Sequence, residues 1–169
     1  MTETHFCYHC GGLLVEEREN GFFRERCSQC GEIHYRQYKV GVASIVIDHG
    51  KLLLAQRNYD PWNGYWNLPA GFVEIEESLE EAVAREALEE TGMHVNVVGL
   101  HKIFTYHDDP RGDGIVLFYD CESHGGTFIA NEEVSACGYF AKSALPAQIA
   151  GAGHQAMVQC LIEEGLLYG

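Results

Sequence analysis

The segment Gly71–Met93, with the sequence GFVEIEESLEEAVAREALEETGM, decides how the rest of this chain is interpreted. Ser78 followed by Glu81 has the spacing of a capping box, in which each side chain binds the backbone N–H of the other residue. Gly92 stands at the position where a glycine commonly ends a helix. The segment therefore predicts a helix from Ser78 to Thr91.

Several carboxylates of this predicted helix lie on the face that should be buried. At about 100° per residue, Glu86 and Glu90 continue the apolar stripe of the helix, and Glu89 lies at its edge. Buried carboxylates are rare without a partner because a charge loses its hydration on burial. Carboxylate oxygens within one helical turn of each other suit Mg²⁺ or Mn²⁺. The alternative is a solvated acidic face on which Arg85 pairs with Glu81 and Glu89 at four-residue spacing.

Stretches rich in β-branched residues and leucine lie on both sides of this helix. We expect two strands within residues 39–57, separated by a turn at His49-Gly50, and further strands in HVNVVGLHKIFTYH, GIVLFYDCE and VSACGYF. A second helix is expected from about Leu145 to Leu167. This order of strands and helices indicates a mixed α+β domain over residues 39–169.

The composition excludes several classes of protein. The 169 residues include 11 Lys and Arg against 25 Asp and Glu, which gives a net charge of −14. This charge repels a phosphate backbone, so we expect no nucleic-acid partner, although a divalent cation can still bring a small anionic substrate to the carboxylates. No apolar stretch reaches the roughly 18 residues of a membrane span, and no secretory signal is visible. We therefore expect a cytoplasmic protein with no membrane partner.

The cysteines are the second informative feature. The chain has seven of them, an odd number that argues against a disulfide framework and for a reducing compartment. Four form two Cys-x-x-Cys pairs, whose spacer lets the two thiolates of one turn reach two corners of a tetrahedron around Zn²⁺. The intervening LLVEERENGFFRER reads as a β-hairpin with its turn at Asn20-Gly21. These features look like a zinc ribbon over residues 1–38 with a structural Zn²⁺ site; a redox role is the minor alternative. The predicted ligands are Cys7, Cys10, Cys27 and Cys30.

The segment Gly71–Met93 also resembles the Nudix box. That motif reads Gly, five residues, Glu, seven residues, Arg-Glu-U, one residue, Glu-Glu, one residue, Gly-U, where U is aliphatic. Ala87 and Met93 occupy the aliphatic positions. The other fixed positions are all filled, by Gly71, Glu77, Arg85, Glu86, Glu89, Glu90 and Gly92.

The resemblance implies a fold, an activity and roles for individual residues. Nudix hydrolases have an α/β/α sandwich around a mixed sheet, and they cleave nucleoside diphosphates linked to another moiety. By this resemblance Glu86 and Glu90 ligate the catalytic cation, with Glu89 as a third ligand or proton acceptor and the carbonyl of Ala70 or Gly71 as a further oxygen. Glu133 is the alternative base, with Glu132 beside it. Glu77 and Arg85 brace the loop and the helix.

The expected substrate follows from a comparison with two groups of Nudix enzymes. A zinc ribbon before a Nudix domain is similar to the NADH pyrophosphatases and RNA-deNADding enzymes, and to a shorter group that acts on ADP-ribose and FAD. The Ser-Gln-Pro-Trp-Pro-Phe-Pro signature of the first group is absent from residues 105–140, and Asp109-Pro110-Arg111-Gly112 is similar to ADP-ribose pyrophosphatases. Tyr65 and Tyr106 are further stacking candidates, whereas Trp66 and Phe72 are expected in the core. The predicted substrate-binding residues are Arg57, Tyr59, Trp62 and Arg111.

These observations lead to one expected function and two alternatives. We expect a Mg²⁺- or Mn²⁺-dependent pyrophosphohydrolase that converts ADP-ribose, FAD or a related nucleoside diphosphate derivative to AMP and a phosphorylated product. An NADH pyrophosphatase and a Nudix-fold regulator that senses such a ligand without turnover are the alternatives. The position of the ribbon suggests a homodimer by family analogy alone.

Overall fold

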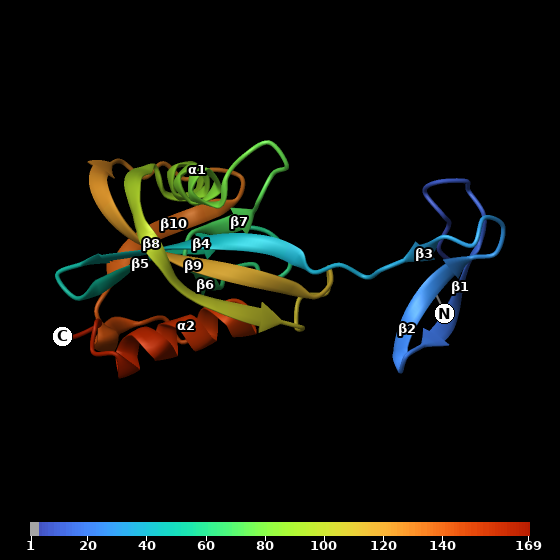
Figure 1. Cartoon of the computed structure of the whole chain (residues 1–169). Coiled ribbons are helices and arrows are strands. Elements are labelled where there is room, and N and C mark those ends of the chain that lie inside the picture. The colour runs from blue at the N-terminus through green and yellow to red at the C-terminus, as the bar shows by residue number, and fades with distance from the viewer. Residues whose placement is uncertain (1–3) are drawn as a thin grey trace. The chain divides into compact units, whose positions relative to one another are not determined.

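The computed structural model describes residues 4–169, and the chain divides into two compact units (Figure 1). The first unit ends at Gln37 and the second runs from Tyr38 to Gly169. No helix within residues 4–169 is long and apolar enough to cross a bilayer. Each unit is described by itself.

The first unit is built on a three-stranded antiparallel sheet. Its strands are β1 (Leu14–Glu19), β2 (Phe22–Cys27) and β3 (Ile33–His34), in this order in the sheet. Between β1 and β2, Asn20 and Gly21 have φ values of 51° and 85°. Two central residues with positive φ belong to the type I′ turn, whose twist matches that of a two-stranded hairpin. The predicted hairpin and its turn are therefore confirmed.

The second unit contains a mixed seven-stranded sheet. Its strands run in the order β10-β5-β4-β9-β8, with the short β6 beside β5 and β7 beside β4. All neighbouring strands are antiparallel except β4 and β9, which are parallel. The strand bounds are β4 Lys39–Asp48, β5 Lys51–Arg57, β6 Trp66–Asn67, β7 Ala70–Phe72, β8 Met93–Tyr106, β9 Gly114–Gly126 and β10 Val134–Phe140.

Two helices cover the two faces of this sheet (Figure 1). The alternation of side chains along β5 builds one core on each face: Leu53 packs with Val83 of helix α1 (Leu79–Thr91), and Leu54 packs with Leu161 of helix α2 (Ala152–Glu163). Each of these apolar side chains is almost fully buried. The expected α/β/α sandwich around a mixed sheet is confirmed.

Helix α1 begins and ends where the sequence predicts. The Ser78 hydroxyl accepts a hydrogen bond from the Glu81 backbone N–H at 3.2 Å, and the Glu81 carboxylate accepts one from the Ser78 N–H at 2.8 Å. Gly92 caps the other end with a left-handed φ of 68°. Both ends are local in sequence, because capping residues satisfy backbone groups within one turn of themselves.

The prediction for helix α2 was wrong at both ends. The helix runs from Ala152 to Glu163 rather than from about Leu145 to Leu167. Before it, the Gln148 carbonyl accepts a hydrogen bond from Trp66 N, and Ala150 N donates to the Trp66 carbonyl, so this stretch pairs with β6 instead of coiling. Gly151 then turns the chain with a φ of 67°. A tertiary pairing thus overrides the helical periodicity of residues 145–151.

Candidate active site

Helix α1 presents two of its carboxylates to a cavity of about 280 Å³. The wall of this cavity comes from β4, the end of β5, β7, α1 and the start of α2, together with the loops that follow β5, β8 and β9. Residues from distant parts of the sequence therefore meet here. The predicted site residues among its lining are Arg57, Tyr59, Trp62, Ala70, Gly71, Glu86, Glu90, Arg111 and Glu133.

Glu86 and Glu90 are buried at the cavity wall, with 9% and 3% of their surface exposed. Burial is the main cause that raises the pKa of both carboxyls, and it raises that of Glu90 to about 8 even though Ala70 N donates to its Oε2 at 2.9 Å. A Cβ at position 71 would overlap the Glu86 carboxylate, so any side chain there would displace this carboxylate from its place at the cavity. Two carboxylates that are desolvated and face a cavity are the oxygen donors that a hard divalent cation prefers, and they fit such an ion.

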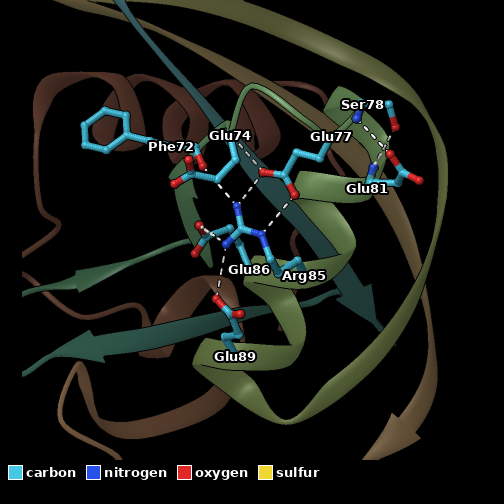
Figure 2. A network of polar contacts seen from close by, with 8 residues as sticks. All are labelled: Phe72, Glu74, Glu77, Ser78, Glu81, Arg85, Glu86 and Glu89. Carbon is cyan, nitrogen blue, oxygen red and sulfur yellow. Dashed lines mark hydrogen bonds and ion pairs between the residues drawn. The ribbon is translucent and has the colours of Figure 1, made fainter.

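Arg85 holds this part of α1 against the preceding loop, as Figure 2 shows. Its Nε and Nη2 donate to the two Glu77 carboxylate oxygens at 3.0 and 2.6 Å, and Nη2 also donates to the Phe72 carbonyl at 3.0 Å. Its Nη1 reaches Glu86 Oε1 at 2.7 Å. Hydrogen bonds from Arg85 are the main reason why the pKa of Glu77 is lowered to about 2. The Arg85 guanidinium therefore links the loop that carries Glu77, strand β7 and the Glu86 carboxylate.

The arrangement differs in one respect from the acidic face considered above. Glu89 does pair with Arg85, at 3.1 Å from Nη1. The Glu81 carboxylate instead receives the Ser78 N–H of the capping box. Of the two pairings expected for Arg85, the structure therefore forms the one with Glu89.

The two candidate bases occupy different places. The side chain of Glu89 is 59% exposed, and Glu89 is absent from the cavity lining. Glu133 lines the cavity from the loop before β10. Its backbone is clamped, because Asn58 N donates to the Glu133 carbonyl at 2.8 Å and Glu133 N donates to Asn131 Oδ1 at 2.9 Å. The structure thus brings Glu133 to the cavity, but not Glu89.

Arg57 is a buried cation at the end of β5. Only 7% of its surface is exposed, its Nε donates to the Pro61 carbonyl at 3.0 Å, and its guanidinium lies 4.2 Å from the centre of the Tyr59 ring. Its Nη2 is buried, and within residues 4–169 it has no hydrogen-bond partner. A buried N–H without a partner costs about 1–3 kcal/mol, so this group is disposed to bind an acceptor that enters the cavity.

Arg111 also lines the cavity, but its charge is paired. Its Nε and Nη2 bind the Asp109 carboxylate at 3.0 and 2.7 Å. Although burial opposes it, these hydrogen bonds hold the pKa of Asp109 below its ordinary value. The Arg111 guanidinium lies 5.6 Å from the centre of the Phe72 ring. Phe72 was expected in the core, and this prediction was wrong: the residue is 37% exposed and lines the cavity. Of the other aromatic candidates, Tyr106 lines the cavity and Tyr65 does not.

His154 is a cavity residue that sequence reasoning missed. It lies on the first turn of α2, packs edge-to-face on Phe118 with 5.4 Å between the ring centres, and is half-buried, with its Nδ1 shielded from solvent. Burial lowers its pKa to about 4, with the Arg57 charge as the second cause. Its Nδ1 has no hydrogen-bond partner within the described residues. A lone histidine next to glycines carries no periodic or motif signal, so only the tertiary structure reveals it.

The pKa of His154 predicts an acid-sensitive contribution to stability. Between its folded pKa of about 4 and its ordinary value of 6.5 the unfolded chain binds more protons, so stability must fall as the pH drops through this window. The loss attributable to this residue should reach about 3 kcal/mol. Urea unfolding of the wild type and of His154→Gln at intervals from pH 7 to pH 4 measures it. The wild-type free energy should fall more steeply than that of the variant, and parallel curves would contradict the assignment.

The first unit gathers the four paired cysteines. Their sulfur atoms lie within 4.8 Å of one another, with Cys10 Sγ 3.4 Å from Cys27 Sγ and Cys7 Sγ 3.8 Å from Cys30 Sγ. The backbone N–H groups of Cys30 and Gln29 point at Cys27 Sγ, and the first of these is the main cause that lowers the pKa of this thiol to about 6. Four converging sulfurs with N–H donors fit a tetrahedral Zn²⁺ site.

Known proteins resemble this chain along most of its length. A family model described as the NUDIX domain matches residues 36–159. The ADP-ribose pyrophosphatase of Methanocaldococcus jannaschii is 37% identical over 116 residues, which are 66% of this chain and 69% of that protein. The NAD-capped RNA hydrolase NudC of Chromobacterium violaceum is 32% identical over 142 residues, 83% of this chain and 51% of NudC. The chain thus spans about half the length of this second relative.

A solved structure extends the likeness to nearly the whole fold. The crystal structure of a NUDIX hydrolase from Nitrosomonas europaea superposes with a TM-score of 0.80 at 30% identity, covering 94% of this chain and 90% of that one. The comparisons agree with three features of the structure: the helix that carries Glu86 and Glu90, the hydrogen bonds that Arg85 makes around it, and the α/β/α sandwich. On this evidence the chain belongs to the Nudix hydrolase family, whose members act on phosphoanhydride bonds, and it carries a cluster of four cysteines near its N-terminus.

Proposed function

We propose that this protein is a Mg²⁺- or Mn²⁺-dependent pyrophosphohydrolase of nucleoside diphosphate derivatives, with ADP-ribose or FAD as its substrate and AMP as one product. The observation that carries this proposal is that one cavity brings together two buried carboxylates, Glu86 and Glu90, and an Arg57 N–H group that has no partner among residues 4–169. The oxygens of a pyrophosphate share several negative charges, and a cation held by the carboxylates would neutralise them together with Arg57.

Glu86 and Glu90 are the side chains that would hold the catalytic cation, and the carbonyl of Ala70 would add an oxygen. When bound, a divalent cation would neutralise the pyrophosphate and favour attack by water. Arg85 positions Glu86 through the 2.7 Å hydrogen bond, and Ala70 N positions Glu90. We assign Glu89 to the outer edge of this centre because its side chain is largely exposed.

Glu133 is the residue that we assign as the general base. Three observations support this assignment: Glu133 lines the cavity, its backbone is held by two hydrogen bonds, and its charge contributes to the raised pKa of both Glu86 and Glu90. In this role it would accept a proton from the water that attacks phosphorus. Asn131 and Asn58 would then be positioning residues that fix its loop.

The remaining walls suit the two ends of a dinucleotide. Arg57 Nη2 and His154 Nδ1 are buried polar atoms without a partner in the described chain, and they would bind phosphate or ribose oxygens. The exposed face of Phe72 and the indole of Trp62 would stack on a flat base. The paired Arg111 would support the Phe72 ring rather than bind phosphate.

The experiment that tests the proposed function compares substrates directly. The purified chain is incubated with Mg²⁺ and, separately, with ADP-ribose, FAD, NADH and an NAD-capped RNA, and the products are quantified by chromatography. We expect AMP from ADP-ribose or FAD at the highest rate. Faster cleavage of NADH or of the capped RNA would move the protein to the second group of zinc-ribbon Nudix enzymes.

A parallel measurement separates catalysis from mere binding. Isothermal titration with ADP-ribose in Ca²⁺ and in Mg²⁺ reports affinity, while the product assay reports turnover. Tight binding without any product, with Mn²⁺ also tried, would overturn the hydrolase proposal in favour of a ligand-sensing regulator.

A further inference from the structure

A further group of metal-ligating side chains lies at the end of α2, among residues that the proposed hydrolase mechanism does not use. His101 Nε2 lies 3.0 Å from Glu164 Oε2, and Cys160 Sγ lies 3.2 Å from Glu164 Oε1. The three ligand atoms all lie within 4.8 Å of one another. In a tetrahedral zinc site the bond lengths place ligand atoms about 3.3–3.8 Å apart, so small side-chain movements suffice to close this group around one ion.

The fold directs these side chains toward one another from two elements. Cys160 and Glu164 are four residues apart and therefore lie on the same face of α2 and its C-terminal cap. On β8 the pairing with β9 shifts register between Leu100 and Lys102, which marks a bulge at His101. In a regular strand His101 and Lys102 would point to opposite faces, yet both contact α2 here. The bulge thus aims His101 at the helix.

A carboxylate orients the imidazole from behind. Asp120 on β9 lies 3.0 and 3.1 Å from His101 Nδ1 through its two oxygens. If Nδ1 carries the proton that Asp120 accepts, Nε2 has its lone pair free for a cation, which is the second-shell arrangement typical of metal-binding histidines. The His101 side chain is 13% exposed and that of Glu164 is 41% exposed, so the group is semi-enclosed with a path to solvent.

The ammonium of Lys102 is a cation that would compete with a metal ion for this group. It lies 3.0 Å from Cys160 Sγ, among the charges of Glu163 and Glu164. The rest of the Lys102 residue is exposed, so the side chain can swing into solvent when a more strongly bound cation arrives. A divalent ion would then face one thiolate, one imidazole and one carboxylate.

We propose that His101, Cys160 and Glu164 form a further metal site, distinct from the carboxylates of α1 and from the four-cysteine cluster, that binds a borderline divalent transition metal such as Zn²⁺. Sulfur and nitrogen donors select Zn²⁺ or Co²⁺ over Mg²⁺. The site would tie the C-terminal end of α2 to β8. The opposite end of the same helix carries His154 at the cavity, so metal occupancy would also stiffen one wall of the candidate active site.

Cobalt titration of the full chain tests this proposal. Mg²⁺ in large excess keeps the α1 carboxylates occupied, and thiolate-to-cobalt charge-transfer absorption then reports only cysteine-ligated metal. The variants are Cys160→Ser and His101→Gln, which keep side-chain size. The matched control is Cys121→Ser, because Cys121 and Cys160 are equally buried, at 8% exposed, on opposite faces of the sheet. Near-ultraviolet circular dichroism verifies that each variant is folded.

The expected result is a loss of one bound metal ion per chain in Cys160→Ser relative to both the wild type and Cys121→Ser, with at least a tenfold weaker affinity in His101→Gln. Elemental analysis after equilibrium dialysis against Zn²⁺ should likewise find one zinc ion per chain fewer in Cys160→Ser than in the wild type and Cys121→Ser. Lys102→Met should bind the metal more tightly than the wild type, because it removes the competing ammonium. Equal metal content in the wild type and in Cys160→Ser would overturn the proposal, whether or not the four-cysteine cluster holds zinc.

Discussion

Glu86→Gln should abolish nearly all turnover while the protein stays folded. The substitution preserves the shape of the side chain but replaces a carboxylate that faces the cavity by a neutral amide, and it removes one proposed ligand of the catalytic cation. Loss of one such electrostatic contact lowers kcat on the order of 10²–10³-fold. Steady-state kinetics with ADP-ribose and FAD over a range of Mg²⁺ concentrations measure the effect, with circular dichroism as the check of folding.

A matched control lies on the same helix. Glu80→Gln makes the identical chemical change in the first turn of α1, where the side chain is exposed and away from the cavity lining. Its turnover should stay close to that of the wild type. If both variants are equally active, the metal assignment of Glu86 fails; if both are equally inactive, the loss reflects the helix and not the site.

Cys27→Ser should abolish zinc binding by the first unit and unfold it. This unit has few buried apolar side chains among its described residues, chiefly Cys7 and Cys27 themselves, so it lacks a core that could replace the metal. Structural zinc in small domains contributes about 10–16 kcal/mol of binding free energy that is also folding free energy. We expect the zinc content to fall by one ion per chain and residues 4–37 to become sensitive to protease.

The control for this prediction is His9→Gln. His9 is exposed next to Cys10 and lies outside the group of four sulfurs, so its removal should leave the zinc in place. His34, whose Nε2 lies 3.3 Å from Cys7 Sγ, is a less suitable control because it contacts a proposed ligand. Full zinc retention in Cys27→Ser, measured by elemental analysis, would show that the four cysteines do not form the metal site.

Several features of the site could be predicted because they depend on residues that are close in sequence. Helix α1 has both of its ends encoded within one turn, in the Ser78–Glu81 capping box and in Gly92. The burial of Glu86 and Glu90 follows from the helical period alone. The glycine at position 71 has a physical reason that the motif only implied, since any side chain there would collide with Glu86.

Other predictions were limited by contacts between distant residues. The sequence could not decide between Glu89 and Glu133, because both are exposed acids and only the fold brings the loop before β10 to the cavity. Phe72 was expected in the core by its hydrophobicity, yet β7 turns it into the cavity wall beside Arg111. The start of α2 was misplaced because residues 148–150 pair with β6, a partner that lies about eighty residues earlier in the chain.

The sequence by itself determined the family, the α1 carboxylates, the cysteine pairs and the hairpin turns, because each depends on local spacing, helical period or the φ preference of glycine and asparagine. The tertiary structure decided which polar groups face each other across the cavity. It brought Arg57 and His154 to one cavity, where Arg57 Nη2 and His154 Nδ1 are buried without a partner in the described part of the chain, and it paired Arg111 with Asp109. It also placed His101 against Cys160 and Glu164 through a bulge in β8. These juxtapositions arise from strand order and helix docking, whose free energy is spread over many long-range contacts and leaves no short motif to recognise.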